Sequence, residues 1–412
     1  MNKDNISALL MAIAVVSLIV GFAIYFNSPD LNRASSSSSS SSPSSPGVST
    51  TVFIPAATNK NGDASSSSSN SQIEKAQFQI DKSQFKKAPD FAKITGYINT
   101  KPISLKDLKG KVVLVDFWTY SCINCIRTIP YLVDWNEKYA DKGLVIVGVH
   151  SPEFEFEKNI DNVKAAVKKY GIKYPVLQDN DKGTWDAYQN RYWPRKYLID
   201  NEGYIRYDHI GEGGYAEIEK VIQSLLTERA AQTGSISNIN LNINTTTPKN
   251  VQTVDFAKIN TPELYFGYQL ARAPLGNSEG FKPNQTVTYS IPQRSDLKPN
   301  TIYLIGDWKN NADNMELQSD TGRIALVYSA KSVNIVAGGE GGVGEQKELS
   351  VSEDGAALTN KSGGGVDLSA QGKLIVDGQR LYNLSMHEGY DWHSLIIDVK
   401  GKGFQIYTFT FG

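Results

Sequence analysis

The sequence is poor in cysteine and histidine, which excludes several classes of protein. Its 412 residues include only 2 Cys and 4 His. Two cysteines cannot provide the several disulfides that cross-link a small secreted domain, and they cannot form a zinc site made of cysteines alone. Four histidines leave few soft ligands, so we expect neither a metal site nor another cofactor.

An excess of one charge is also missing. The chain has 42 Lys+Arg and 43 Asp+Glu, a net charge of −1. Because no bulk positive charge would steer it onto polyanions, we expect no nucleic-acid partner. At about 150 residues per domain the length allows two or three domains, although Ser-rich stretches take up part of it.

The amino end carries a long apolar run. Residues 6–26 are 21 positions without a charge, and a helix of this length spans about 31 Å, the thickness of the hydrocarbon core. No small-residue cleavage site follows, which favours an uncleaved anchor over a cleaved signal peptide. We expect a short segment, residues 1–5, before a single membrane span, with the amino end inside and the folded domains extracytoplasmic.

Two polar stretches divide the rest of the chain. Residues 27–73 are rich in Ser with scattered Pro and Gly, a composition that predicts a disordered tether with a reach of about 35–40 Å. Residues 231–252 form a second polar linker. The segments 74–230 and 253–412 are then two domains of ordinary size.

The first of these domains alternates strand and helix patterns. The near-continuous apolar run at residues 111–118 is typical of a strand buried on both faces. Apolar spacing predicts a helix over 123–139 directly after it. The other predicted elements are strands at 144–149, 174–177, 195–199 and 204–207, and helices at 157–169 and 218–226. The pattern indicates an α/β fold.

Both cysteines, Cys122 and Cys125, lie in the motif CINC at this strand-to-helix junction. A thiol at a helix N-terminus meets free N–H groups and the positive end of the helix dipole, which stabilise a thiolate. Cys122 is therefore the predicted nucleophile, and Cys125, one turn further along, is the predicted resolving thiol. The same spacing is half of a zinc site, but without a second Cys pair redox chemistry is favoured.

These residues carry a family resemblance. VLVDFWTYSCINC at 113–125 resembles the active-site strand and turn of thioredoxins. Together with HSPEF at 150–154 and YWPRKYLID at 192–200, it is similar to the TlpA-like thioredoxin domain of the DipZ family. Those proteins are extracytoplasmic relatives of the thiol oxidoreductases that serve cytochrome c biogenesis. The resemblance covers residues 78–228 and implies a thioredoxin fold.

The resemblance also implies roles for further residues. Pro194 would be the cis-proline that faces the disulfide, and Trp193 would lie beside the bound substrate. Asp116 would take the proton from the resolving thiol, or else it is a strand-end residue hydrogen-bonded to its neighbours. Relatives in cytochrome maturation often carry a glutamate where Thr128 stands here. Glu153 is the candidate to replace it near the substrate.

Other side chains near the cysteines leave two interpretations open. Trp118 and Tyr120 either shape a substrate-binding rim around the dithiol or belong to the core. Arg127 either helps to hold the thiolate or is solvated. His150 and His209 stand at strand ends without a visible partner, and we assign them no role.

The second domain changes to short alternating runs separated by turns rich in Gly and Asn. Strands are predicted at 286–291, 302–305, 315–317, 324–328, 333–336, 372–376, 394–398 and 405–411. Short strands without helices predict an all-β sandwich of the jelly-roll type. TPELYFGY at 261–268, GDW at 306–308, RLYNL at 380–384 and YTFTFG at 407–412 resemble the domain that follows thioredoxin in DipZ proteins, which is similar to carbohydrate-binding modules.

A role in sugar binding does not follow from such a fold. Five aromatic residues either form a flat platform for a glycan or belong to the core: Tyr265, Tyr268, Trp308, Tyr390 and Trp392. Docking or protein recognition is favoured over glycan binding, which stays open.

Three functions remain. The leading one is a membrane-anchored thiol–disulfide oxidoreductase that reduces or exchanges disulfides in exported proteins. Many DipZ proteins carry a multispan electron-delivering domain, so a single-span chain would need a membrane electron donor of the CcdA/DsbD kind. The alternatives are a thiol peroxidase, for which Thr119 fits but Val115 replaces the expected proline, and a non-enzymatic glycan-binding surface protein.

Overall fold

The computed structural model describes residues 82–234, 244–249, 251–290, 297–339 and 347–412. The predicted anchor at 6–26 and tether at 27–73 lie outside the described residues, as does part of the linker at 231–252. Within the ranges that are described, no helix combines the length and the apolar character needed to cross a membrane.

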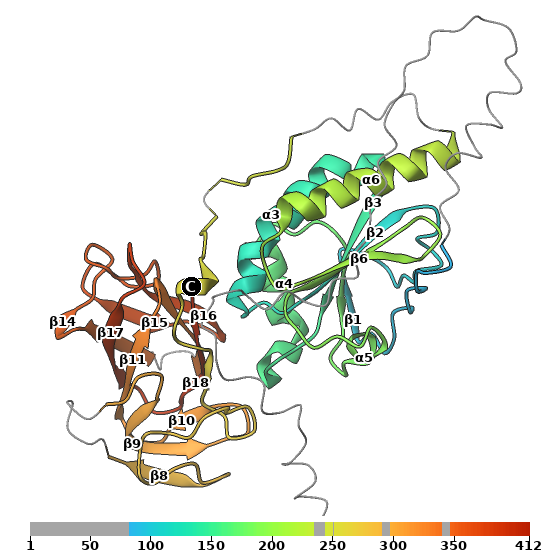
Figure 1. The fold of residues 1–412 in the computed structure, drawn as a ribbon. Helices are drawn as coiled ribbons and strands as arrows, with labels where there is room; N and C mark the ends of the chain where they lie inside the picture. The colour runs from blue at the N-terminus through green and yellow to red at the C-terminus, as the bar shows by residue number, and fades with distance from the viewer. Residues whose placement is uncertain (1–81, 235–243, 250, 291–296, 340–346) are drawn as a thin grey trace, which may run out of the picture. The chain divides into compact units, whose positions relative to one another are not determined.

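The first domain is an α/β unit, as its sequence pattern predicts (Figure 1). Its strands are β1 (Gly96–Ile98), β2 (Val112–Trp118), β3 (Leu144–His150), β4 (Val176–Gln178), β5 (Arg195–Ile199) and β6 (Ile205–Ile210). Its α-helices are α3 (Ile123–Tyr139), α4 (Ile160–Lys169), α5 (Gly183–Ala187) and α6 (Tyr215–Thr233). The sheet order is β1-β4-β3-β2-β5-β6, with β2, β3 and β4 parallel and the other pairings antiparallel.

The central strand β2 is buried on both faces, which explains its continuous apolar run. Alternate residues point to opposite sides of a strand. Val112, Leu114 and Trp118 belong to a core cluster shared with α3, α4 and α6. Val113 and Phe117 belong to a second cluster, shared with α5 and the segment before β2. The end of β2 is therefore a rigid platform for whatever follows it.

The predicted elements of this domain appear with shifted ends. The helix over 123–139 is observed as predicted. α4 begins at Ile160 rather than at residue 157, because the Asn159 side chain accepts a hydrogen bond from the Asp161 N–H and caps the helix there. Before it, Glu155–Lys158 form a 3-10 turn. The short elements β1 and α5 were not predicted.

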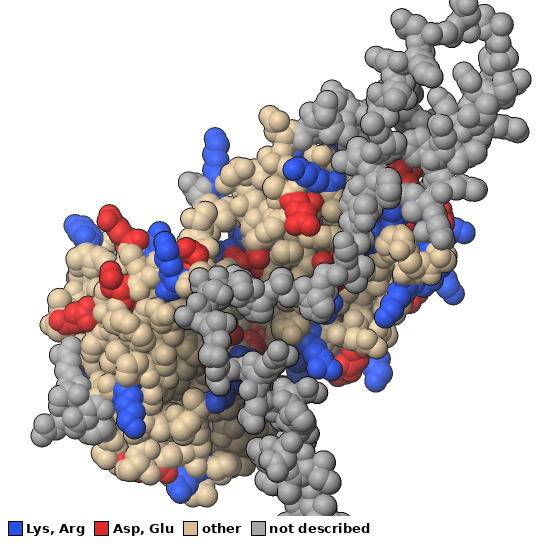
Figure 2. All heavy atoms as spheres, in the orientation of Figure 1, with Lys and Arg blue, Asp and Glu red and all other residues tan. Residues whose placement is uncertain are grey.

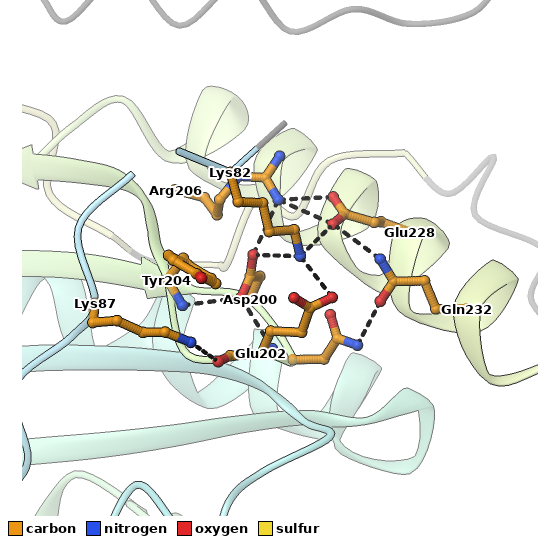
Figure 3. A network of polar contacts seen from close by, with 9 residues as sticks. Lys82, Lys87, Asp200, Glu202, Tyr204, Arg206, Glu228 and Gln232 are labelled. Atoms are coloured by element: carbon orange, nitrogen blue, oxygen red, sulfur yellow. Dashed lines mark hydrogen bonds and ion pairs between the residues drawn. The ribbon is translucent and has the colours of Figure 1, made fainter. Parts of the chain in front are cut away.

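A buried charge network fixes the start of the described chain onto the domain (Figure 3). Lys82 Nζ lies 2.9 Å from Asp200 Oδ2 and 3.1 Å from Glu228 Oε1. Arg206 reaches the same two carboxylates, at 3.2 Å and 2.9 Å. The side chains of Asp200 and Glu228 are only 1% and 7% exposed, so this network joins α6, the β5–β6 hairpin and the amino-terminal segment.

The described residues of the second domain form β-strands, apart from one 3-10 turn at Phe256–Lys258. Its strands are β7 (Leu264–Tyr265), β8 (Thr286–Tyr289), β9 (Tyr303–Asn310), β10 (Met315–Leu317), β11 (Thr321–Ser329), β12 (Ser332–Gly339), β13 (Lys347–Glu353), β14 (Ala356–Ala357), β15 (Lys373–Val376), β16 (Arg380–Met386), β17 (Trp392–Lys400) and β18 (Phe404–Phe411). All strand pairings are antiparallel, in the order β14-β13-β17-β11-β9-β10-β18-β12-β16.

One strand, β9, makes these strands a single curved sheet, a half-barrel. Its first residues pair with β11 and its last residues pair with β10. Gly306 lies between the two pairings with φ +103°, and a Cβ there would lie 3.1 Å from the Thr321 carbonyl oxygen. Only glycine fits such a bend comfortably. The prediction of a domain built of β-strands is confirmed, and the jelly-roll sandwich stays a prediction.

For two of the five aromatic residues the core interpretation holds, rather than the sugar platform. Trp308 is 0% exposed and Tyr265 is 6% exposed, so both lie in the core. Trp392 is 49% exposed.

On the face drawn in Figure 2, Lys and Arg side chains are interspersed with Asp and Glu over the described residues.

Candidate active site

The two cysteines lie where β2 ends and α3 begins. Cys122 is the N-cap of α3, and its Sγ accepts a hydrogen bond of 3.4 Å from the Cys125 N–H. Both thiols are free. Cys122 is partly exposed, whereas Cys125 is 1% exposed. A substrate can therefore reach Cys122, while Cys125 can react only with a sulfur already attached next to it.

Cys125 needs a base before it can react. Burial raises the pKa of its thiol well above the usual value, and the adjacent Cys122 and Asp116 raise it further. A buried thiol of this kind stays protonated at neutral pH, and only the thiolate attacks a disulfide. The residue that accepts its proton must therefore lie within the same buried region.

Asp116 lies in that region. It is 2% exposed in the middle of β2, and its Oδ1 has no hydrogen-bond partner within the described part of the chain. Burial raises the pKa of Asp116 to about 7, against the opposing effect of Lys196. A carboxyl that titrates near neutrality can both accept and return a proton, as a general base does. Among the residues that the structure describes, no hydrogen bond to the Asp116 side chain is observed, and its role as a base stays a prediction.

Lys196 is the counter-charge of Asp116, and the sequence-based analysis missed it. The two residues are directly opposite each other in the β2–β5 pairing. Lys196 is 1% exposed, and its Nζ donates to the Gly211 carbonyl oxygen at 3.0 Å. Burial lowers the pKa of Lys196, while Asp116 and Cys125 raise it. The sequence feature that could have revealed it is a lysine inside an apolar strand, two residues after Pro194.

Glu157 is a second missed residue, and it holds the loop around the cysteines. Its Oε1 accepts a hydrogen bond of 2.5 Å from the hydroxyl of Ser121, the neighbour of Cys122. Its Oε2 accepts from the N–H groups of Glu153 and Phe154, at 2.6 Å and 3.0 Å. Glu157 is 0% exposed. Nothing in its acidic sequence context distinguishes this buried carboxylate from its exposed neighbours.

The Trp193–Pro194 peptide bond is cis, the isomer that the family resemblance implies. The Trp193 indole N–H donates to the Ser151 carbonyl oxygen at 2.9 Å, and its ring packs on Trp185 with centroids 4.3 Å apart. The substrate-facing roles of Pro194 and Trp193 stay predictions.

The aromatic residues beside the motif are core residues. Trp118 is 1% exposed and Tyr120 is 5% exposed, so the structure favours the core interpretation over an open rim. The ring of Tyr120 stacks on His150 with centroids 5.7 Å apart. Burial lowers the pKa of His150 to about 3, so its imidazole is neutral, and its Nε2 lies 3.4 Å from the Thr119 hydroxyl.

Arg127 is buried, so the expectation that it is solvated is wrong. Among the described residues it makes no hydrogen bond to a cysteine, and its role in holding the thiolate stays a prediction. Arg127 is 4% exposed and makes a two-pronged contact with Glu212, with N–O distances of 2.6–3.0 Å. Its Nη2 also donates to Asn124 Oδ1 at 2.7 Å. Because Asn124 lies between the two cysteines, Arg127 orients the first turn of α3.

Glu153 lies in the loop after β3. Glu157 holds the backbone of this loop through the hydrogen bonds described above. Burial raises the pKa of Glu153 to about 8. Among the described residues no hydrogen bond joins it to either cysteine. Thr128 donates its hydroxyl to the Asn124 carbonyl oxygen within the helix. That Glu153 takes over the role of the glutamate that relatives carry at the position of Thr128 therefore stays a prediction.

A partly exposed thiol backed by a buried one is the arrangement that disulfide exchange requires, which makes the first domain a thioredoxin-like dithiol domain. Its residues 85–208 match the AhpC/TSA family, and residues 261–412 match the family described as thioredoxin like C-terminal domain.

Three relatives place the chain within a family. Protein DipZ of Mycobacterium bovis is 37% identical over 331 residues, which cover 79% of this chain and 43% of that protein. Thiol-disulfide oxidoreductase ResA of Bacillus cereus is 34% identical, over 34% of this chain and 77% of ResA. Thiol-disulfide oxidoreductase YkuV of Bacillus subtilis is 31% identical, over 29% of this chain and 79% of YkuV.

The chain belongs to the thiol–disulfide oxidoreductases of the DipZ and ResA type, with Cys122 and Cys125 as its CxxC pair. It spans less than half the length of DipZ. The similarity of the second domain to carbohydrate-binding modules stays a prediction.

Proposed function

We propose that this protein is a membrane-anchored, extracytoplasmic oxidoreductase that reduces or exchanges disulfides in exported proteins. The observation that carries the proposal is the buried Cys125 next to the Asp116–Lys196 pair, below a partly exposed Cys122. The anchor rests on the apolar run at residues 6–26.

The reaction begins with Cys122. Its thiolate attacks a substrate disulfide, a bond forms between Cys122 Sγ and one substrate sulfur, and the other substrate sulfur leaves and takes up a proton. Asp116 then accepts the proton of Cys125, whose thiolate attacks Cys122 Sγ. The second substrate thiol is released, and two electrons have passed from the protein to the substrate. The reverse sequence transfers a disulfide.

A reductase of this type must be recharged after each turnover. Two electrons have to reach the Cys122–Cys125 disulfide, and we propose a membrane electron donor of the CcdA/DsbD kind as their source. The proposal fails if the dithiol stays reduced in cells that lack every such donor. Membrane fractionation and protease protection of intact cells test the anchor and the side on which the domains lie.

The dithiol chemistry is tested by trapping. The variant Cys125→Ser cannot resolve the mixed disulfide, so Cys122 should retain its substrate proteins, which mass spectrometry identifies after non-reducing gels. The matched control is the double variant Cys122→Ser/Cys125→Ser, which should retain none. Equal recovery of partners from both variants would overturn the proposal.

Peroxide reduction is the second candidate, because residues 85–208 match the AhpC/TSA family. It would oxidise Cys122 to a sulfenic acid, which Cys125 would condense with. Against it, the hydroxyl of Thr119 lies against His150 in the core, 3.4 Å from Nε2. Rapid hydrogen peroxide consumption by the reduced protein would favour this candidate over disulfide exchange.

A further inference from the structure

Two of the four histidines, far from the cysteines in sequence, meet in the second domain. His387 follows β16 and His393 lies at the start of β17. Their rings stack with centroids 4.1 Å apart and planes 14° apart. Glu353, the last residue of β13, approaches the same place, with Oε2 2.8 Å from His387 Nε2.

The ring of His393 is held so that one of its two nitrogens has no hydrogen-bond partner among the described residues. His393 Nδ1 lies 2.8 Å from Asp354 Oδ2, so Nδ1 carries the proton and donates it to this carboxylate. Its Nε2 is buried and has no hydrogen-bond partner among the described residues. A buried acceptor without a partner is costly unless something binds to it.

Like His393, Glu353 is oriented by a hydrogen bond to a neighbouring side chain. Glu353 Oε1 accepts a hydrogen bond of 2.5 Å from the Tyr328 hydroxyl, which also contacts Ser385 Oγ at 2.8 Å. Oε2 is therefore the oxygen that faces the histidines. The Glu353 side chain is 3% exposed, whereas those of His387 and His393 are 17% and 15% exposed, so solvent reaches the cluster.

We propose that Glu353, His387 and His393 bind a divalent transition-metal ion, with Zn²⁺ the expected ion, and that Asp354 positions His393 for it. Two imidazoles and one carboxylate form a common zinc ligand set. A carboxylate that accepts the other ring N–H of a metal-binding histidine is the usual partner around such sites. This proposal contradicts the expectation, drawn from the small number of histidines, that the chain has no metal site.

The spacing of the ligand atoms fits this ion. One ligand atom from each of the three side chains lies within 4.8 Å of the others. Tetrahedral bonds of about 2.0–2.1 Å place ligand atoms about 3.3 Å apart. The separation of 2.8 Å between Glu353 Oε2 and His387 Nε2 and the upper limit of 4.8 Å for all three atoms lie on either side of that value. Three protein ligands leave a fourth position for water or a ligand.

A simple ion pair explains less of the cluster. Glu353 and one protonated histidine would account for the 2.8 Å contact. They would leave His393 stacked on a cation with its buried Nε2 facing no donor. A metal ion instead uses all three groups at once.

The test is a titration of the full chain with Zn²⁺ by calorimetry. The background carries Cys122→Ser and Cys125→Ser, so that thiols bind no zinc. We expect one equivalent of Zn²⁺ to bind with a Kd below about 10 µM, and His387→Gln or His393→Gln to weaken binding at least a hundredfold. The matched control His209→Gln, a histidine of the first domain, should leave binding unchanged. Millimolar Mg²⁺ should not compete, because Mg²⁺ prefers oxygen ligands.

A positioning role for Asp354 gives an independent readout. Its side chain is 54% exposed, so Asp354→Asn should leave the fold intact, which circular dichroism checks. Loss of this carboxylate should weaken Zn²⁺ binding about 10- to 100-fold. Binding weaker than about 1 mM in the background protein, or equal binding in all variants, would overturn the proposal. If the histidine variants fail to fold, Asp354→Asn decides the question.

Discussion

Asp116 lies directly opposite Lys196 across the β2–β5 pairing, and both side chains are buried. Each carries a charge that burial disfavours, and each partly offsets the cost of the other. The electrostatic field of both residues acts on Cys125. The strand that supports the dithiol thus also carries Asp116, the proposed acid–base group.

Asp116 should make the protein less stable as the pH rises. Its pKa is about 7 in the folded protein and about 3.9 in an unfolded chain. The folded state therefore binds this proton more tightly, so the contribution of Asp116 is present below about pH 4 and is lost as the pH rises through 7. Asp116→Asn should raise the free energy of unfolding at pH 8 by about 1–3 kcal/mol, less than the full shift implies because Lys196 loses its counter-charge.

Urea unfolding at pH 5 and pH 8 measures this effect. The gain from Asp116→Asn should be larger at pH 8 than at pH 5. A gain of equal size at both pH values would show that Asp116 does not titrate between them.

The same variant should slow resolution of the mixed disulfide. Without a base, Cys125 must lose its proton to water, so we expect resolution to fall about 100-fold or more at pH 7. Stopped-flow release of a thiol from a Cys122-linked substrate measures this step. In the parent the rate should rise with pH and level off above about 7, where Asp116 is fully ionised. In Asp116→Asn this levelling off should disappear, because the thiolate fraction of Cys125 keeps rising with pH. Alkylation of Cys122 serves as the control, because Cys122 stays equally accessible.

The sequence predicted the parts of the site that depend on local pattern. A buried strand followed by an amphipathic helix placed Cys122 at a helix N-terminus, and the family resemblance pointed to Asp116 and Pro194. Lys196 was missed because its position opposite Asp116 depends on the antiparallel β2–β5 pairing of strands far apart in sequence. Glu157 was missed because its burial depends on how the loop after β3 folds back.

The second domain shows the same limit. Most of its strands follow from alternation, yet β13 and β16 were not predicted although β13 alternates buried and half-buried residues. These two strands carry Glu353 and lead to His387. The meeting of two histidines with a glutamate could not be expected from a count of four histidines, because it depends on the order of strands in the sheet.

Lys196 should set the pH at which the protein works. Its positive charge lowers the pKa of Asp116. Lys196→Met keeps the length of the side chain and removes the charge, so the pH midpoint of disulfide resolution should move upward by about 1 unit or more. Arg195→Met is the matched control, because Arg195 pairs instead with Asp208 at 2.7 Å. An unchanged midpoint in Lys196→Met would show that the pair is purely structural.

Glu157 should matter more for stability than its acidic neighbours. Glu157→Ala would leave two N–H groups and the Ser121 hydroxyl without their partner, so we expect a loss of about 2–4 kcal/mol in the free energy of unfolding. Glu155→Ala removes an exposed carboxylate that pairs with Lys158 at the surface, and should change stability by less than about 0.5 kcal/mol. Urea unfolding compares the two variants. Since Glu157 holds Ser121 beside Cys122, its loss should also slow substrate reduction, and Glu157→Gln should recover part of it by keeping one acceptor oxygen. Equal stability of the two alanine variants would show that the loop holds its place without this carboxylate.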